Sequence, residues 1–165
     1  DPAAGRYPAV KDLPGLRIVV GRTPSANVLP WSRGRFGRAQ IEAVRAAIEQ
    51  GRASGRFVIL AFHHNLHRRG LAAEVVSRLR DRDAVWALLA DAKPDLVLHG
   101  HDHHQHETVV PGTHVPVIGC GSSSVDSPRA ANAARFNVYA VDDGRLSVER
   151  WQWQQANRRF ARLPG

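Results

Sequence analysis

The stretch DLVLHGHDHHQH, residues 95–106, decides the fold and the chemistry that this sequence can support. Its first four residues, DLVL, form a short apolar segment after Pro94, which predicts a buried strand. Five histidines follow within the next eight residues. Open α/β sheets place ligands and catalytic groups at the ends of their strands, so this junction predicts a functional site.

An earlier stretch, FVILAFHHNLH at residues 57–67, repeats the arrangement of a buried strand followed by histidines. The strand is expected over residues 57–62, and His63 and His64 come directly after it. All nine histidines of the chain fall between His63 and His114. If the two strands are neighbours in one sheet, His63 lies within reach of the histidines that follow the second strand.

His101 and His103 stand two residues apart, and residues at this spacing in an extended segment point to the same side. Gly100 in front of them permits a turn that a side chain would obstruct. Three neutral imidazoles suit Zn, Fe, Mn, Co or Ni without choosing among them. We therefore predict that His63, His101 and His103 bind metal. The competing interpretation is that they are ordinary core or surface histidines.

The rest of the pattern predicts an α/β domain with mixed sheets. A strand at 16–20, a helix at 37–50 that Gly51 ends, and the strand at 57–62 form a unit typical of a parallel crossover. A helix is expected at residues 83–92, capped by Asp81 or Asp83, and a third buried strand at 95–98. Antiparallel strands are expected after it, at residues 107–110, 115–119, 135–141 and 145–153. We expect one domain over residues 1–153 and a polar, frayed tail over residues 154–165.

Composition narrows the class of protein. The 165 residues with 43% apolar content suit one domain with its own core, and the single cysteine, Cys120, excludes a disulfide framework. The net charge of +8 comes mostly from arginine, which makes nucleic acid a conceivable partner, but the arginines are scattered and favour a solvated surface. No apolar run reaches about 18 residues, so we expect no membrane span and a cytoplasmic location. The chain starts at Asp1 and has no methionine, so we expect a processed chain or a fragment.

Two motifs in order carry a resemblance to a known family. The first is Phe62-His63-His64-Asn65, and the second, about forty residues later, is Gly100-His101-Asp102-His103. Together they resemble the closing motifs of the calcineurin-like metallophosphoesterases. The stretches GRFGRAQ at 34–40 and RFNVY at 135–139 also resemble bacterial members, so the likeness covers nearly the whole chain.

The resemblance implies the C-terminal portion of a layered αββα sandwich that hydrolyses a phosphomonoester or phosphodiester with two divalent metal ions. In that family the metals activate a water for attack on phosphorus. His63, His101 and His103 would be metal ligands, and His64 would sit beside them and contact the phosphate-ester substrate.

The departures from the family matter as well. Its N-terminal motifs D-x-H, G-D and G-N-H-D, which supply carboxylates, an asparagine and the general acid, are absent. From its position alone we hypothesise that Asp1 is the last residue of a cut G-N-H-D motif. The catalytic acid is therefore unassigned. Asn65 stands where many members have proline, which is expected to loosen the loop after His63. We expect the chain alone to have little activity.

Two alternatives stay open. His101, His103 and Glu107 resemble the H-x-H-x-x-x-E motif of the cupins, a single-metal barrel class, although Glu107 is better explained as a solvent-facing strand residue. The second alternative is a metallophosphoesterase fold that serves as a non-catalytic binding scaffold.

Overall fold

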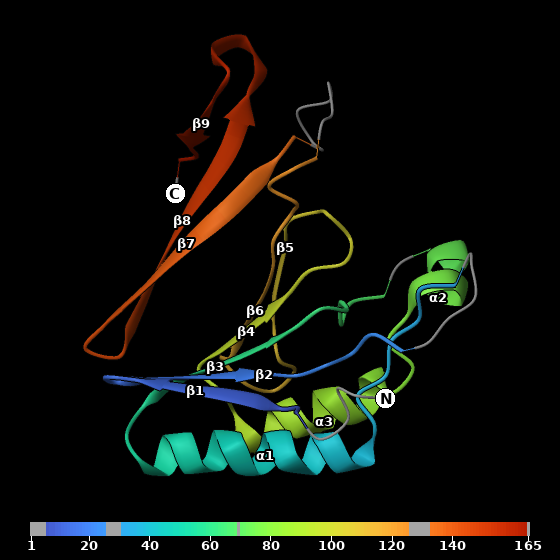
Figure 1. The fold of residues 1–165 in the computed structure, drawn as a ribbon, viewed down its shortest axis with the longest axis vertical. Coiled ribbons are helices and arrows are strands. Elements are labelled where there is room, and N and C mark those ends of the chain that lie inside the picture. Colours follow the sequence, from blue (N-terminus) through green and yellow to red (C-terminus); the bar gives the residue numbers. More distant parts are fainter. Residues whose placement is uncertain (1–5, 26–30, 69, 126–132, 165) are drawn as a thin grey trace.

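The computed structural model describes residues 6–25, 31–68, 70–125 and 133–164. Within these ranges a six-stranded sheet carries helices on one face and a three-stranded sheet on the other (Figure 1). The elements are β1 Ala9–Leu13, β2 Leu16–Val20, α1 Arg38–Ala53, β3 Phe57–Phe62, α2 Leu71–Ser77, α3 Arg82–Ala92, β4 Leu96–His99, β5 His106–Val109, β6 Pro116–Gly119, β7 Arg135–Asp142, β8 Arg145–Gln154 and β9 Arg159–Arg162, with a 3₁₀ turn at Gln155–Asn157. This is a mixed α/β sandwich, as the sequence predicted.

The large sheet has the strand order β1-β2-β3-β4-β6-β5. Strands β2, β3, β4 and β6 run parallel, whereas β1 and β5 pair antiparallel at the two edges. Central parallel strands are covered on both faces, which explains why their sequences are continuous apolar runs instead of alternating ones. The predicted crossover from β2 through α1 to β3 is confirmed.

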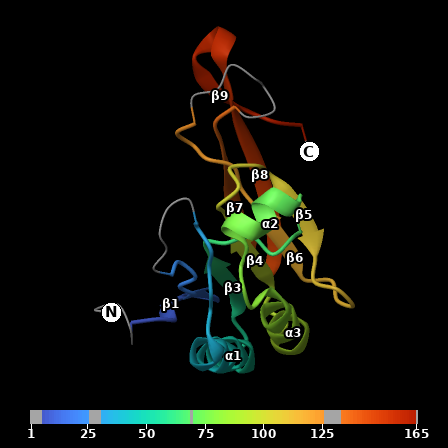
Figure 2. The same ribbon diagram turned by 90° about the vertical axis from the view of Figure 1, so that its right-hand side faces the viewer.

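The main core lies between the large sheet and the helices α1 and α3, which Figure 2 shows end-on beneath it. Val44 and Ile48 of α1 and Leu88 and Leu89 of α3 are fully buried against the strands. Burying an aliphatic side chain of this size stabilises a fold by about 1.5–3 kcal/mol. A smaller cluster around Ile59 on the other face packs against the second sheet.

Gly51 does not end the first helix as predicted, because α1 continues to Ala53. A Cβ at Gly51 would lie 2.8 Å from both Arg17 Cδ and Val58 Cγ2. The glycine therefore serves the close packing of the helix on the sheet, and the chain turns at Gly55, whose φ is +69°.

The tail after Gln154 does not fray as expected. Residues Arg159–Arg162 form β9, which pairs antiparallel with β8 after the 3₁₀ turn. Phe160 anchors the strand, because its ring lies 4.9 Å from Phe136 and 5.4 Å from Trp153. Aromatic packing thus holds a segment whose composition is mostly polar and basic.

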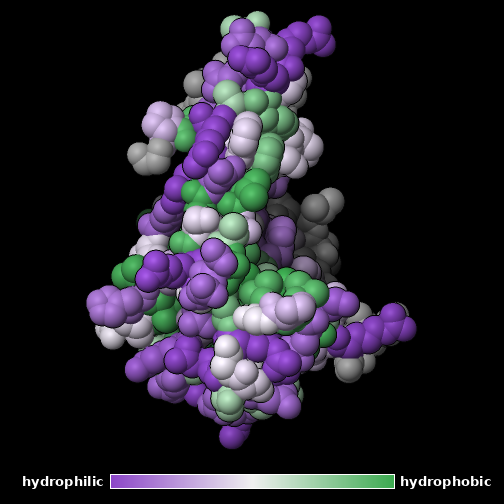
Figure 3. Space-filling model, turned by 90° about the vertical axis from the view of Figure 1, so that its left-hand side faces the viewer, coloured by the Kyte–Doolittle hydropathy of each residue, from purple (hydrophilic) through white to green (hydrophobic). Residues whose placement is uncertain are grey.

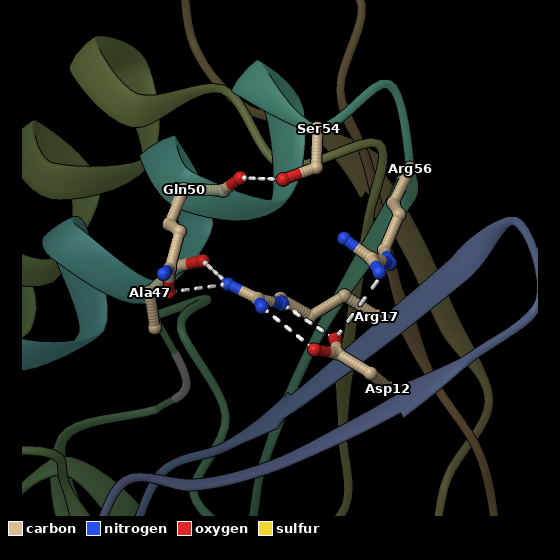
Figure 4. Close-up of polar contacts among 6 residues, drawn as sticks. All are labelled: Asp12, Arg17, Ala47, Gln50, Ser54 and Arg56. Atoms are coloured by element: carbon tan, nitrogen blue, oxygen red, sulfur yellow. Dashed lines mark hydrogen bonds and ion pairs between the residues drawn. The ribbon is translucent and has the colours of Figure 1, made fainter.

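A buried arginine fastens the first hairpin to the helix layer (Figure 4). Arg17 is 5% exposed and forms a bidentate pair with Asp12, at 2.7 and 2.8 Å. Its third nitrogen donates to the Ala47 carbonyl and to Gln50 Oε1, at 3.1 and 2.9 Å. The buried charge is thereby satisfied by one hairpin residue and by α1.

The two sheets leave a groove where their turns face one another, on the side shown in Figure 3, where apolar residues form a strip between the lower and upper parts. Its lining includes Leu13, Leu16, Phe57, Ile59, Tyr139 and Val141. None of the helices in the described ranges is long and apolar enough to cross a membrane.

Candidate metal centre

The two histidine-rich loops leave neighbouring parallel strands at the same end of the sheet. Phe62 of β3 is paired in register with His99 of β4, and Gly100 N donates to the His63 carbonyl at 3.0 Å. The backbone itself therefore starts both loops side by side, which confirms the expected adjacency of the two strands.

His63 and His101 meet at this point and are called the open pair below. His101 Nδ1 and His63 Nε2 are joined by a hydrogen bond of 3.0 Å, and the ring centroids are 4.9 Å apart at an interplanar angle of 81°. His63 is exposed and His101 is half-buried. Two nitrogens in adjacent positions of an octahedral ion with bonds of about 2.1 Å stand about 3.0 Å apart, so the spacing of the open pair matches two ligands of one ion. Binding would replace the hydrogen bond between the two rings.

His103 is exposed, and the backbone around it is not extended as predicted. His101 has φ +77° and His103 has φ +57°, so both stand in the left-handed region within a series of bends. Non-glycine residues adopt this conformation at a cost, and such strain clusters at functional sites. Metal binding by His103 stays a prediction. The expectation that His101 and His103 point to the same side of an extended segment was wrong.

His64 lies beneath the open pair, with its ring centroid 4.4 Å from that of His101. It is 3% exposed. Its Nε2 donates to the Ser32 carbonyl at 2.9 Å, so Nδ1 accepts from the Thr23 hydroxyl at 2.8 Å. Burial lowers the pKa of His64 to about 4, so the ring is neutral near pH 7.

These contacts give His64 a positioning role, because both ring nitrogens are already bonded to the protein. Substrate contact by His64 remains a prediction. Thr23 is fully buried and also accepts the His64 backbone N–H at 3.2 Å, yet no pattern in its loop sequence marked it. Gly34 of the GRFG stretch makes room for this ring, because a Cβ there would lie 2.5 Å from His64 Nδ1.

A second group of histidines, called the covered cluster below, lies deeper at the same edge. It consists of His67, His99 and His106, and one ring nitrogen of each lies within 4.8 Å of the others. None of these three histidines was among the predicted metal ligands. Burial lowers the pKa of His99 to about 4, which keeps its imidazole neutral near pH 7.

Asp102, between the two histidines of the G-H-x-H motif, connects the loops. Its Oδ2 lies 3.0 Å from His67 Nε2, and its Oδ1 accepts from Asn65 Nδ2 at 2.6 Å. Asn65 is 3% exposed, so it ties the loop after β3 to the loop after β4. The expectation that asparagine loosens this loop was therefore wrong, because its amide supplies a donor that proline lacks.

The cupin alternative does not fit this geometry. The motif sits in a mainly parallel α/β sheet, not in a barrel. Glu107 lies on β5, and both of its oxygens accept from Arg150 at 2.7 Å. That ion pair and a neighbouring amide lower the pKa of Glu107, and they hold it as a strand residue on the surface.

Comparisons with known proteins support the fold. No family model matches the chain, and no curated protein matches it. Among solved structures it is similar to GAP50, the anchor in the inner membrane complex of Plasmodium, with 15% identity and a TM-score of 0.60. The match covers 90% of this chain and 49% of that one, so the chain spans about half the length of GAP50.

The chain is also similar to Vps29 from Entamoeba histolytica. A single mutant of Vps29 shows 13% identity and the wild type complexed with Zn²⁺ shows 12%, each with a TM-score of 0.38 over 88% of this chain and 97% of theirs. The GAP50 match shows a shared fold and leaves activity to be argued from the site.

Proposed function

We propose that this chain supplies the histidine half of a metal-dependent phosphoesterase that hydrolyses a phosphomonoester or phosphodiester. The open pair is the observation that carries this function. Its two imidazoles come from adjacent parallel strand ends, have nitrogens 3.0 Å apart, and include an exposed ring that a substrate can reach. A catalytic metal needs such accessibility, because one coordination position must stay open.

His63 and His101 would hold divalent metal, with His103 of the same loop as the third ligand. Imidazole suits Zn, Fe, Mn, Co and Ni, so the ion is not specified, and we propose two ions with further ligands from elsewhere in the whole protein. When bound, such ions lower the pKa of water and neutralise charge on the phosphoryl oxygens.

The remaining residues of this chain position the open pair. Thr23 and Ser32 hold the His64 ring against His101, and Asn65 with Asp102 fastens the two loops to one another. Residues locked by packing and by hydrogen bonds keep metal ligands in one orientation, which raises affinity.

The test is hydrolysis of p-nitrophenyl phosphate and of bis(p-nitrophenyl) phosphate by the Mn²⁺-loaded whole protein and by this chain alone. We expect activity in the whole protein, a loss of at least about 100-fold in kcat on His101→Asn, and little activity in the isolated chain. His114→Asn, at an exposed histidine outside both groups, is the matched control. Strong hydrolysis by the isolated chain would contradict a half-site.

A binding scaffold is the second candidate, because the solved structure with the shared fold is described as an anchor. A scaffold would show no metal-dependent hydrolysis in the whole protein, and His101→Asn would leave its partner binding unchanged. The same assay, combined with a pull-down of the wild type and the variant, separates the two functions.

A further inference from the structure

The covered cluster is built across three strands of the large sheet. His99 of β4 and His106 of β5 are both paired in register with Gly119 of the intervening strand β6. Strands separated by one neighbour stand about 9.5 Å apart, so the two imidazoles can approach only over the middle strand. A Cβ at Gly119 would overlap His99 Cε1 and lie 3.0 Å from His99 Nε2. The glycine therefore makes the space that the His99 ring occupies.

His67 completes the cluster from the loop after β3. Its ring stacks on that of His106 with centroids 3.8 Å apart and an interplanar angle of 19°, and it lies 5.8 Å from the His99 ring. The loop after β3 and the two strands that flank residues 100–105 thus bring three imidazoles to one point.

The contacts of these rings resemble those of metal-ligating histidines, whose second ring nitrogen faces a carboxylate or carbonyl. His67 Nε2 lies 3.0 Å from Asp102 Oδ2, and His99 Nδ1 lies 3.4 Å from the Gly100 carbonyl oxygen. The tautomers protonated at these two atoms have their ring lone pairs on His67 Nδ1 and His99 Nε2. His106 Nδ1 is buried and has no hydrogen-bond partner in the part of the chain that the structure describes.

From this arrangement we propose that His67, His99 and His106 bind one divalent ion of the Zn²⁺ class, in a site separate from the open pair. A tetrahedral Zn²⁺ with bonds of about 2.0–2.1 Å holds its ligand nitrogens about 3.3 Å apart. The nitrogens lie within 4.8 Å of one another, so binding requires side-chain rotations that bring them to that spacing. Three imidazoles with an adjacent carboxylate suit Zn²⁺ and Co²⁺, not the oxygen-seeking Mg²⁺ or Ca²⁺.

The ion has a structural role in this fold. The segment 100–105, which carries both histidines of the G-H-x-H motif, runs between His99 and His106. An ion bound to those two residues fixes both ends of the segment, and Asp102 in its middle is held by His67. The covered cluster therefore positions residues 100–105, the loop that carries His101. His99 itself is buried, with 7% exposure.

The experiment is a titration of the metal-free chain with Co²⁺, followed by visible absorption, together with Zn²⁺ content after dialysis. We expect a tetrahedral Co²⁺ spectrum and a tightly held Zn²⁺ in the wild type. His106→Gln should lose both and should reduce the Zn²⁺ stoichiometry by one. His63→Gln and the exposed control His114→Gln should keep both, and circular dichroism should show that every variant is folded.

Gly119→Ala adds an independent test, because it keeps all three ligands and removes only the space for the His99 ring. It should weaken Zn²⁺ binding by about 10–100-fold. Retention of the tetrahedral spectrum in His106→Gln, or its loss in His63→Gln, would overturn the site. A wild type without any such spectrum would identify the cluster as a hydrogen-bonded histidine group and overturn it as well. Hydrolysis by the whole protein is measured separately, so failure here leaves the phosphoesterase proposal standing.

Discussion

The open pair and the covered cluster lie at the same end of one sheet and close together in sequence, yet their surroundings differ. The open pair has an exposed ring and rests on the locked ring of His64. The covered cluster lies over Gly119 and has a carboxylate, Asp102, beside His67. Catalytic metal sites keep an open position and structural sites are closed. Both groups lie at strand ends, so it is their neighbouring side chains that distinguish an accessible site from a closed one.

The largest expected effect is a separation of activity from stability between the two groups. In the whole protein, His101→Asn should lower kcat by at least about 100-fold and leave the Zn²⁺-dependent rise in Tm intact, because it removes a catalytic ligand. His106→Gln should abolish that rise in Tm and lower kcat by about 10-fold, through a less ordered loop. Phosphatase assays and thermal melts with and without Zn²⁺ measure both. Equal effects of the two variants on kcat and on the Zn²⁺-dependent rise in Tm would show that the two groups do not have separate catalytic and structural roles.

The next largest effects are expected at two glycines, Gly34 beside the His64 ring and Gly119 beside the His99 ring. Gly34→Ala would place a Cβ 2.5 Å from His64 Nδ1, so the ring beneath the open pair must shift. We expect a loss of about 1–3 kcal/mol in the free energy of unfolding, as in other overpacked cores. Metal binding by the open pair should weaken, while the Co²⁺ spectrum of the covered cluster stays unchanged. Urea denaturation and Mn²⁺ titration measure this, and the reverse pattern is expected for Gly119→Ala.

Much of the open pair could be predicted from the sequence. The runs FVILAF and DLVL mark buried strands on composition alone, and parallel neighbours bring His63 and His101 to one edge. The conformation of His101 and His103 could not be predicted, because positive φ values in non-glycine residues are imposed by the surrounding fold.

The covered cluster could not be predicted, because it depends on the strand order β4-β6-β5. The strand that separates His99 from His106 in space comes after both in the sequence, and no local pattern states where it inserts. Thr23 gave no signal either, because it lies in an irregular loop and acts on a residue 41 positions away. The segment β9 was missed because long-range packing of Phe160 overrides its polar composition.

A smaller effect on stability is expected at the hydrogen bond between Asn65 and Asp102, which connects the two histidine loops. Asn65→Ala removes the amide that donates to Asp102 at 2.6 Å, so the free energy of unfolding should fall by about 1–2 kcal/mol. Because Asp102 lies between the ligands of both groups, metal affinity should fall modestly at each. Urea denaturation and paired Mn²⁺ and Co²⁺ titrations measure this, with the exposed Ser54→Ala as control. An effect on one group alone would show that Asn65 does not couple the loops.

The smallest effect on stability is expected in the Arg17 network of Figure 4, which joins the β1–β2 hairpin to α1. The Arg17 guanidinium lowers the pKa of Asp12 below its usual 3.8, so the pair stabilises the fold above that value, and this contribution is lost as the pH falls through the lowered pKa. Asp12→Asn should lower Tm by about 2 °C at pH 7, because Arg17 loses its charged partner. Neither metal titration should change, since Arg17 contacts α1 and not the histidine loops.

Thermal melts at pH 7 and below 3.8 should show the difference between wild type and variant shrinking as the carboxylate becomes protonated. A change in either metal affinity would mean that the hairpin and the histidine edge are coupled through the sheet.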